Sequence, residues 1–466
     1  MKKIFLPAIF ILSALLGGCS AEQEPDAVVI NGEELYKVNI SFDLTVSPAT
    51  SNTRASRPLE SSDCWQRVTD VKIYVFRSDT GDEGSYYYYY PTVYNSLTDQ
   101  TSRQPYFSVE EFSHKDDTNW DDHISGNETH TYNITPLLGK GYYRFLAVGR
   151  DDDPASTPLS ISWRQNITEW SQALMENNAG HPRVTEIFSG YPTEKGSADV
   201  KTFVVTEKTN FSDTIILHRA VAGVLLHVKN IPVTLKSDFS WYSIDSPTGI
   251  IRQDLEKGQE YAVNEVAIVC AGYYPTLDLV SRRWHEPKPF QPDASRFFAT
   301  RLTSISTKGL TQKIGNYGYP VYYGSKATGN FVFPAKLVDR VFYADYYGGE
   351  KEDPENLTAF DRSLYLCFYT ISRTGAYYPI KMIPIKIARS FIHDPGAHEN
   401  CAGDDVIDPT GTHFNLVANH IYCLGMKNHG DGTDIPIDLE DQLSHPELEI
   451  TVVGAWQVDI DIDMDF

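Results

Sequence analysis

Histidine, acidic and cysteine side chains gather between residues 393 and 413, where they offer the best set of metal ligands in the sequence. His393, His398, Cys401 and His413 supply the nitrogen and sulfur atoms that zinc prefers. Their spacing matches no metal-binding motif, however, and the Gly, Pro and Asn residues between them are typical of a surface loop. We therefore expect neither a metal ion nor a cofactor.

Catalytic motifs are missing from the sequence. It contains no G-x-S-x-G, G-x-x-x-x-G-K-[ST], H-E-x-x-H, C-x-x-C or G-x-G-x-x-G. Asp151-Asp152-Asp153 has carboxylates for calcium but no further oxygen ligands in sequence, so a solvated acidic turn is the simpler interpretation. A carboxylate pair for glycoside hydrolysis stays open, because no feature selects one pair among the 62 acidic residues. We do not expect an enzyme.

Cys19 is the residue with the clearest predicted chemistry. Lys2 and Lys3 precede a mostly apolar run from Phe5 to Leu16, which has the length of a signal-peptide core and is too short to span a membrane. The following Leu-Gly-Gly-Cys resembles a lipobox, in which small residues admit a signal peptidase and the cysteine thiol carries diacylglycerol. We predict a signal peptide over residues 1–18 and lipidation of Cys19, with an ordinary secretory signal as the alternative.

Residues 19–35 are polar and acidic, and we expect them to form a tether. The stretch just after Cys19 looks like the signal that carries lipoproteins to the outer leaflet in some Gram-negative anaerobes. Membrane contact is then expected through the lipid alone. Five further cysteines are an odd number, so at least one thiol stays free or pairs between chains, and the sequence leaves the disulfide pairing open. Cys367 lies in an apolar run and is expected in a core.

Two segments near the ends of the chain alternate apolar and polar residues. Val38 to Val46 does so over nine residues, which predicts a half-buried strand. In the last segment, 457–466, one face carries aspartates and the other is apolar, with Val458, Ile460, Ile462, Met464 and Phe466. This last strand either pairs within its own domain or is donated to another molecule, where main-chain hydrogen bonds supply affinity and alternate side chains fill pockets.

The loop at residues 47–57 follows the first alternating strand and contains the step Thr53-Arg54-Ala55. A trypsin-like protease needs an accessible arginine on a flexible segment, and this loop qualifies. Cleavage between Arg54 and Ala55 would free the strand at 38–46 and leave an apolar groove. The tail strand of a second subunit has the right alternation to fill it.

Strand patterns dominate the body of the chain. We predict strands at 68–76, 86–90, 141–149, 203–228, 364–371, 378–387, 420–427 and 448–453, with alternation placing Tyr86, Tyr88 and Tyr90 opposite Tyr87 and Tyr89. One helix is predicted from Ile167 to Met175. Many short strands with turn signals indicate an all-β protein of β-sandwich domains with few short helices, which we place at 36–230 and 231–466.

The amino-acid composition argues against two classes of binding partner. The chain has 466 residues, a formal charge of −22, 29 Tyr and 22 Phe. The acidity argues against nucleic acid, because no basic patch is present to release counterions from phosphates. It also argues against electrostatic docking on an anionic membrane surface.

Several short motifs carry a family resemblance. They are the Cys19 lipobox, Thr53-Arg54-Ala55 after the first strand, Tyr74-Val75-Phe76, Gly141-Tyr142-Tyr143-Arg144, Leu217-His218-Arg219-Ala220, Asn419-His420-Ile421-Tyr422, and Ile450-Thr451-Val452 with Trp456. Together they resemble the fimbrillin family, the lipoprotein precursors of type V pili. The motifs are spread over most of the chain, although each of them is short. The acidic tail and the five further cysteines do not fit the family pattern.

The resemblance implies two transthyretin-like β-sandwich domains and export as a lipoprotein to the outer membrane and cell surface. It also implies removal of the first strand by an Arg-specific protease at Arg54-Ala55, and polymerisation by strand exchange into adhesive fimbriae, with residues 458–466 as the donor strand. The partners would be other fimbrial subunits and a host protein or glycan. A lipid-anchored anchor subunit or a tip subunit remains the alternative to a shaft subunit.

A surface lipoprotein that binds glycans is a second alternative. Trp163, Trp170, Trp241 and Trp284 lie in polar sequence contexts, and exposed aromatic rings on a β-sandwich stack on sugar rings. Each of them is more simply interpreted as a core or hairpin residue. A glycan array separates the two interpretations, because tight, monovalent binding without polymers would support a glycan-binding lipoprotein.

Overall fold

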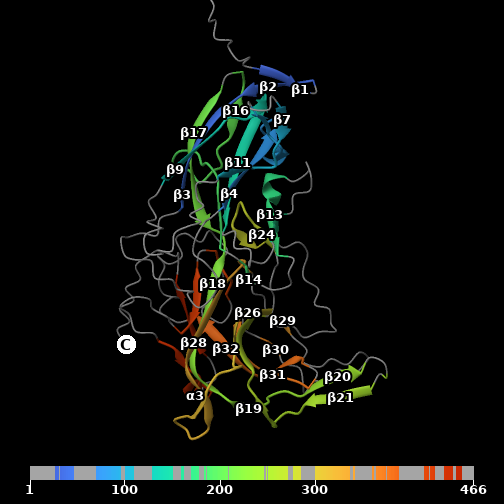
Figure 1. Ribbon diagram of the computed structural model, residues 1–466, viewed down its shortest axis with the longest axis vertical. Coiled ribbons are helices and arrows are strands. Elements are labelled where there is room, and N and C mark those ends of the chain that lie inside the picture. Colours follow the sequence, from blue (N-terminus) through green and yellow to red (C-terminus); the bar gives the residue numbers. More distant parts are fainter. Residues whose placement is uncertain are drawn as a thin grey trace, which may run out of the picture.

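The computed structural model describes most of the chain between residues 27 and 453. The described residues are 27–30, 32–46, 70–95, 100–109, 129–150, 159–161, 169–177, 183–184, 186–207, 209–245, 248, 250–270, 276–284, 300–335, 340–341, 359–360, 364–373, 375–387, 414–418, 420–425, 435–443 and 448–453. Nearly all of their regular structure is β-strand, in two groups of sheets stacked along an elongated body (Figure 1). The prediction of an all-β fold of β-sandwich character with few short helices is confirmed.

The main sheet of the N-terminal half is built around β11 (Gly141–Arg150). Its strand order is β5-β4-β11-β15-β17-β3-β9, with β16 and β8 pairing to its side. The bounds are β3 Asn39–Val46, β4 Asp70–Ser78, β5 Tyr87–Tyr89, β8 Phe107–Val109, β9 Thr129–Ile134, β15 Ile187–Gly190, β16 Phe203–Val205 and β17 Asn210–Arg219. Tyr143, Phe145 and Ala147 of β11 enter one core, while Leu146 and Val148 enter another, so β11 is buried on both faces.

A smaller sheet has the order β1-β2-β10-β6-β7, formed by β1 (Ala27–Ile30), β2 (Glu33–Lys37), β10 (Leu137–Gly139), β6 (Thr92–Asn95) and β7 (Gln100–Arg103). The structure differs here from the tether expected over 19–35, because residues 27–30 and 33–37 are strands. Leu35 and Tyr36 explain the difference, since both are buried and pair with β10. Two acids beside them, Glu33 and Glu34, made the stretch look like solvated linker.

The C-terminal half contains a sheet of eleven strands in the order β14-β28-β18-β33-β35-β32-β31-β23-β26 with β27 and β34 beside it. The bounds are β14 Arg183–Val184, β18 Ala222–Pro232, β23 Glu265–Cys270, β26 Thr300–Ser306, β27 Gln312–Ile314, β28 Pro320–Val332, β31 Leu364–Ile371, β32 Tyr377–Ile387, β33 Ile421–Leu424, β34 Ile437–Asp438 and β35 Leu448–Val453. Strand β18 pairs antiparallel with β28 and parallel with β33. The domain division expected at residue 230 therefore falls inside β18.

Short strands complete the fold. They are β12 Leu159–Ile161, β13 Leu174–Asn177, β19 Thr234–Lys236, β20 Trp241–Asp245, β21 Ile250–Leu255, β22 Glu260–Ala262, β24 Thr276–Asp278, β25 Arg283–Trp284, β29 Arg340–Val341 and β30 Ala359–Phe360. The described helical elements are the 3-10 turns Glu83–Ser85 and Trp170–Gln172 and the helix α3, Leu439–Gln442. Among the described residues no helix has the length and apolar character needed to cross a membrane.

The predicted helix at 167–175 is wrong over its described part. Trp170–Gln172 is a single 3-10 turn, and Leu174–Asn177 forms β13 between β12 and β24. The spacing of Trp170 and Leu174 fits a helical face, but Met175 is buried against the second half of the molecule, and the sheet pairing overrides the local pattern.

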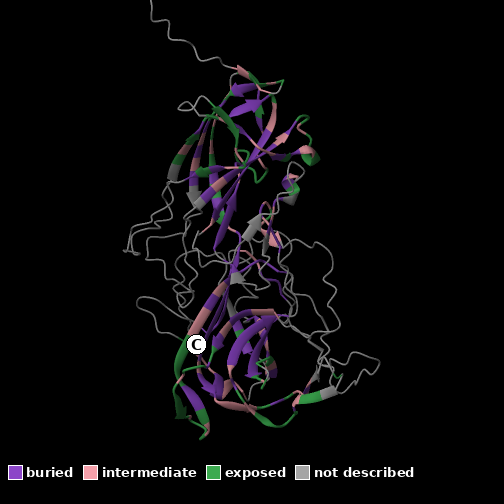
Figure 2. Cartoon of the chain, turned by 45° about the vertical axis from the view of Figure 1, so that its right-hand side comes forward, coloured by how far each residue is buried: buried purple, intermediate pink, exposed green. Residues whose placement is uncertain are grey.

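Three large cores hold the fold together (Figure 2). One lies within the N-terminal half, one within the C-terminal half, and the third combines residues of both, such as Tyr88 with Phe331 and Trp170 with Leu277. Pairing of β13 with β24 and of β14 with β28 reinforces this link. The two halves are therefore joined by packed side chains and by strand pairing as well as by the chain.

The row of tyrosines at 86–90 confirms the predicted alternation. Tyr86 and Tyr88 are 1% and 3% exposed and belong with Tyr90 to the core shared by the two halves. Tyr89 packs instead against the core of the N-terminal half, and Tyr87 is exposed. Most of the tyrosines in this row therefore contribute to core packing.

Candidate functional site

The candidate functional site is the place where the first strands of the chain lie in the N-terminal half. We call residues 27–46, comprising β1, β2 and β3, the N-terminal arm. Thr45 to Ile40 pair antiparallel with Thr129 to Ile134, and Lys37 to Leu35 pair with Leu137 to Gly139. Between these two runs the Val38 amide donates to the Pro136 carbonyl at 3.0 Å. The arm therefore forms one ladder in a single register across both sheets.

Strand β3 is also paired on its other side. Asn39 to Val46 run parallel to Asn210 to Leu217 of β17. Strand β3 is thus inserted between β9 and β17, which follow it in the chain by about 90 and 170 residues on the numbering of the sequence. Removing β3 would leave two facing strand edges with unpaired backbone N–H and C=O groups.

Alternate side chains of the arm fill the core of the N-terminal half. Val38, Ile40, Phe42 and Leu44 are at most 1% exposed. The Phe42 ring meets those of Phe145 and Phe203 edge-on, with centroids 5.1 and 6.3 Å away. Burying four such side chains is worth several kcal/mol, at about 1.5–3 kcal/mol each. The arm is a structural part of the core and its removal would leave an apolar groove.

The outward side chains of β3 are polar. The Asn39 side chain donates to Asn210 Oδ1 at 3.0 Å, and the Thr131 hydroxyl donates to Asp43 Oδ1 at 2.7 Å. These contacts lie at the surface and contribute little compared with the apolar face. The strand predicted at 38–46 is confirmed as β3, within one residue, with the predicted inward and outward faces.

Polar contacts fix the start of the arm. Arg77 Nη1 on β4 contacts Glu33 Oε1 of β2 at 2.5 Å. Lys140 Nζ lies 5.3 Å from the centroid of the Tyr36 ring and 3.3 Å from Glu207 Oε1. No local sequence pattern indicates these contacts, because the residues of β2 lie among acidic residues. The pattern Leu35-Tyr36 beside Val38 and Ile40 was the available sign that the strand begins earlier.

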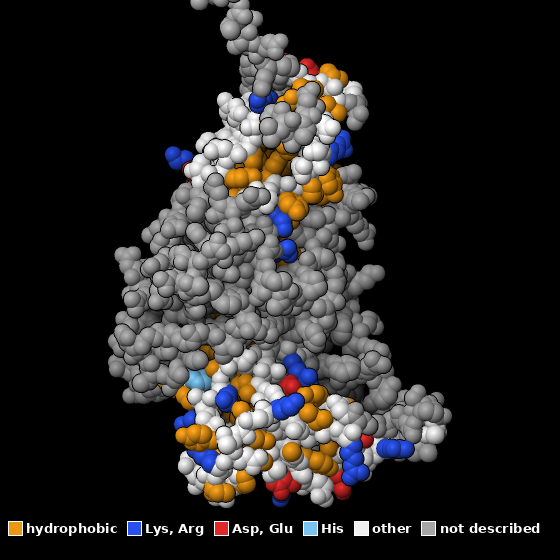
Figure 3. All heavy atoms as spheres, viewed as in Figure 1, with side chains coloured by type: hydrophobic (Ala, Val, Ile, Leu, Met, Phe, Trp, Pro, Cys, Tyr) orange, Lys and Arg blue, Asp and Glu red, His pale blue; other side chains and the backbone are white. Residues whose placement is uncertain are grey.

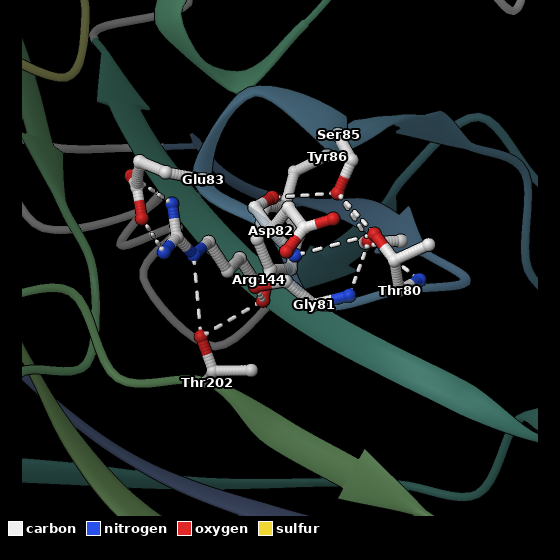
Figure 4. A network of polar contacts seen from close by, with 9 residues as sticks. Thr80, Gly81, Asp82, Glu83, Ser85, Tyr86, Arg144 and Thr202 are labelled. Carbon is white, nitrogen blue, oxygen red and sulfur yellow. Dashed lines mark hydrogen bonds and ion pairs between the residues drawn. The ribbon is translucent and has the colours of Figure 1, made fainter.

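A second polar network joins β11 to the turn at 83–85 (Figure 4). The Arg144 guanidinium donates to both oxygens of Glu83 at 2.6 Å and to the Thr202 hydroxyl at 3.3 Å, and it lies 3.9 Å from the Tyr86 ring centroid. Arg144 is buried, whereas Glu83 is exposed on a 3-10 turn. The hydrogen bonds from Arg144 hold the pKa of Glu83 below its usual value. This arrangement is structural: it clamps the turn at 83–85 onto β11.

Several predicted site residues lie outside the described part of the chain. These are Cys19, Arg54 and Ala55, and the tail residues Val458, Ile460, Ile462, Met464 and Phe466, together with the histidine-rich stretch at 393–413. Within the described ranges no three His, Cys, Asp or Glu side chains are grouped closely enough to hold a metal ion.

Cys270, Cys367, Cys423, Trp170 and Trp241 have buried side chains. Cys270, Cys367 and Cys423 are buried, as expected for Cys367. Burial raises the pKa of the Cys423 thiol to about 12 and that of Cys367 further. Trp170 and Trp241 are 5% and 7% exposed, which withdraws both from stacking on a sugar.

Comparisons with known proteins give similar solved structures only. No protein-family model matches the chain, and no curated protein matches it. The fimbrilin FimA from Porphyromonas gingivalis is similar at 12% identity over 89% of this chain and 96% of its own, with a TM-score of 0.34. The truncated tip fimbrial protein Mfa3 and the fimbrial anchor protein Mfa2 from the same organism have identities of 12% and 8%. Mfa3 covers 86% of this chain and 97% of its own with a TM-score of 0.30, and Mfa2 covers 74% and 81% with a TM-score of 0.28. These similar structures are fimbrial proteins, the class that the short sequence motifs resemble.

Proposed function

We propose that the chain is a structural subunit of a surface fimbria that is exported as a lipoprotein and assembled by strand exchange, in support of adhesion and biofilm formation. The observation that carries the proposal is the N-terminal arm. It supplies a complete inserted strand, is buried on one face, and is connected to the body through the loop that contains Arg54. A strand at a chain end can leave without breaking the order of the strands that remain.

Cleavage between Arg54 and Ala55 would separate the arm from the body covalently. The apolar groove left by β3 then requires four or five inward apolar side chains at every second residue. Residues 458–466 carry Val, Ile, Ile, Met and Phe at that spacing. A second copy of the chain therefore contains a suitable replacement strand, and repetition of the exchange yields a polymer.

Lipidation at Cys19 places the unprocessed chain on the outer membrane before assembly. Cleavage after Arg54 also removes Cys19, so the same cut that opens the groove releases the subunit from the lipid. A subunit that keeps its arm also keeps its lipid and cannot receive a donor strand. This uncleaved form would act as an anchor subunit. A tip subunit would receive no donor strand or donate none.

The proposal is tested by cleaving the secreted chain with trypsin under native conditions and examining it by electron microscopy. We expect filaments whose subunits begin at Ala55 by mass spectrometry. Arg54→Gln should abolish them, while the neighbouring Arg57→Gln serves as the matched control and should leave assembly unchanged. Deleting residues 457–466 should leave cleaved monomer.

Three results would contradict parts of this proposal. Filaments that form equally well without residues 457–466 would exclude the tail as donor strand. Assembled filaments whose subunits retain lipidated Cys19 would instead support an anchor. Tight, monovalent binding on a glycan array by a chain that never polymerises would favour the glycan-binding lipoprotein.

A further inference from the structure

Arg77 is a residue of the body that loses a charged partner when the N-terminal arm departs. Its Nη1 contacts Glu33 Oε1 of β2 at 2.5 Å, and its Nη2 contacts Asp79 Oδ1 at 3.2 Å and the Lys140 carbonyl at 3.1 Å. The Glu33 side chain is 38% exposed, whereas that of Asp79 is 82% exposed. Glu33 is thus the better-shielded carboxylate on Arg77, and it belongs to the segment that processing removes.

The position around Arg77 is shaped for a carboxylate. A Cβ at Gly139 would lie 2.5 Å from Glu33 Oε1, so the missing side chain at residue 139 makes the room that the carboxylate occupies. The guanidinium also lies 5.4 Å from the centroid of the Tyr89 ring, a favourable cation–π contact. Tyr143 holds the backbone at Gly139 in place, since its hydroxyl donates to the Gly139 carbonyl at 2.8 Å.

A second cation lies beside this position. Lys140 faces the Tyr36 ring of the arm and the exposed Glu207. Departure of the arm removes Glu33, Glu34 and Tyr36 together and opens the edge of β10, on which Leu137 to Gly139 were paired. In the face shown in Figure 3, Lys and Arg side chains lie on the described surface of the N-terminal half. An extended segment that carries a carboxylate would find both backbone partners and positive charge there.

We propose that Arg77 is a carboxylate-binding position, which Glu33 fills before processing and the acidic tail of a second copy fills afterwards. The inference rests on the proposed strand exchange and names the residue that selects the incoming strand. The tail, residues 457–466, has four aspartates alternating with its apolar residues. The tail therefore carries charge of the kind that Arg77 has lost, beside the apolar face that enters the groove.

The inward positions of the arm and the tail agree in number. The arm places Tyr36, Val38, Ile40, Phe42 and Leu44 inside, and the tail offers Val458, Ile460, Ile462, Met464 and Phe466. Apolar complementarity supplies affinity but accepts many alternating strands, whereas one half-buried cation discriminates among them by charge. The family resemblance does not explain the acidic tail. In this proposal its carboxylates are what Arg77 recognises.

The test measures capture of a fluorescent peptide of residues 457–466 by the secreted full-length chain after cleavage at Arg54. Fluorescence polarisation is read with the peptide in large excess, so that it outcompetes the tails of other copies. We expect Arg77→Gln to weaken capture about tenfold and Arg77→Lys to restore part of the loss. Arg252→Gln, an exposed arginine on β21 in the other half, is the matched control and should change nothing.

Peptide variants identify the source of the carboxylate. A peptide with all four aspartates changed to asparagine should bind the native chain more weakly and should be insensitive to Arg77→Gln if the aspartates are recognised. Every peptide carries an amidated C-terminus, so that aspartates supply the only carboxylates. As a second variant, Glu33→Gln should speed capture of the unmodified peptide, because it loosens the arm without changing Arg77.

Each contrary outcome has a distinct meaning. Capture by Arg77→Gln as tight as by the native chain would overturn the role of Arg77 and leave strand exchange standing. Loss of every peptide, charged or neutral, by Arg77→Gln would assign Arg77 a structural role and overturn the proposal. No capture by the native chain would overturn the strand exchange itself, and the inference with it.

Discussion

Arg219 and Glu186 form an ion pair inside the N-terminal half. Arg219 Nε donates to Glu186 Oε1 at 2.6 Å, and the Glu186 side chain is fully buried. The pair links β17 to the residue that precedes β15, next to the ladder that joins these strands. Burial lowers the pKa of Arg219, while the nearby carboxylate opposes this shift and keeps the pair charged.

Removing one partner of this pair should be costly. We expect Glu186→Gln to lower the free energy of unfolding by about 3 kcal/mol, because it leaves a buried guanidinium without its counter-charge. Urea unfolding of the secreted chain measures the change, and Glu194→Gln, on an exposed turn, is the control. Equal stability of the two variants would show that the buried pair contributes nothing to the fold.

The Arg144–Glu83 contact predicts a pH dependence. The pKa of Glu83 is lowered in the folded protein, so its contribution is present above the ordinary glutamate pKa and is lost as the pH falls through the lowered value. Glu83 is exposed, and we expect Glu83→Gln to cost only about 0.5 kcal/mol at neutral pH. The difference should vanish in urea unfolding at strongly acidic pH. A difference that persists there would mean that the ion pair is not its source.

The apolar face of the arm predicts how firmly the arm is held. Phe42→Ala removes a fully buried ring that contacts Phe145 and Phe203, and it should lower the free energy of unfolding by about 3–5 kcal/mol. After cleavage at Arg54 the arm of this variant should leave the body faster, as followed by mass spectrometry of the released segment. Ser41→Ala, on the outward face of β3, is the control. Equal release rates would show that the groove does not hold the arm through its core.

The buried thiols should be chemically silent in the native protein. Cys270, Cys367 and Cys423 are buried, and burial raises the pKa of Cys423 to about 12, so almost no thiolate is present at neutral pH. Iodoacetamide should leave all three unmodified in the native chain and modify all three in guanidinium, as read by peptide mass spectrometry. Rapid native labelling at any of them would indicate local opening of its strand.

Periodicity predicted most of the sheet strands because one buried face dictates the pattern. The strand expected at 141–149 is β11, and that at 364–371 is β31. Prediction failed where pairing partners distant in sequence decide the structure. The helical spacing around Trp170 yields to the pairing of β13 with β24, and the acids around Leu35 conceal a strand that exists because β10 is there to receive it.

The candidate site was predictable in outline and not in detail. The alternation at 38–46 indicated an inserted strand, since its inward residues are all apolar. The parallel partner β17 and the contact of Glu33 with Arg77 involve residues far apart in sequence, and no local pattern reports such pairings. Side-chain alternation reports which face is buried, but it does not report which strand lies alongside.

The most direct test of the central claim is to identify what lies beside β9 before and after assembly. Thr131 of β9 is exposed and contacts Asp43 of the arm, so a photoreactive amino acid at residue 131 reports the occupant of the groove. In the uncleaved chain it should cross-link to the arm. In filaments it should cross-link to residues 457–466 of a second copy. Filaments in which residue 131 still cross-links to the arm would contradict the account.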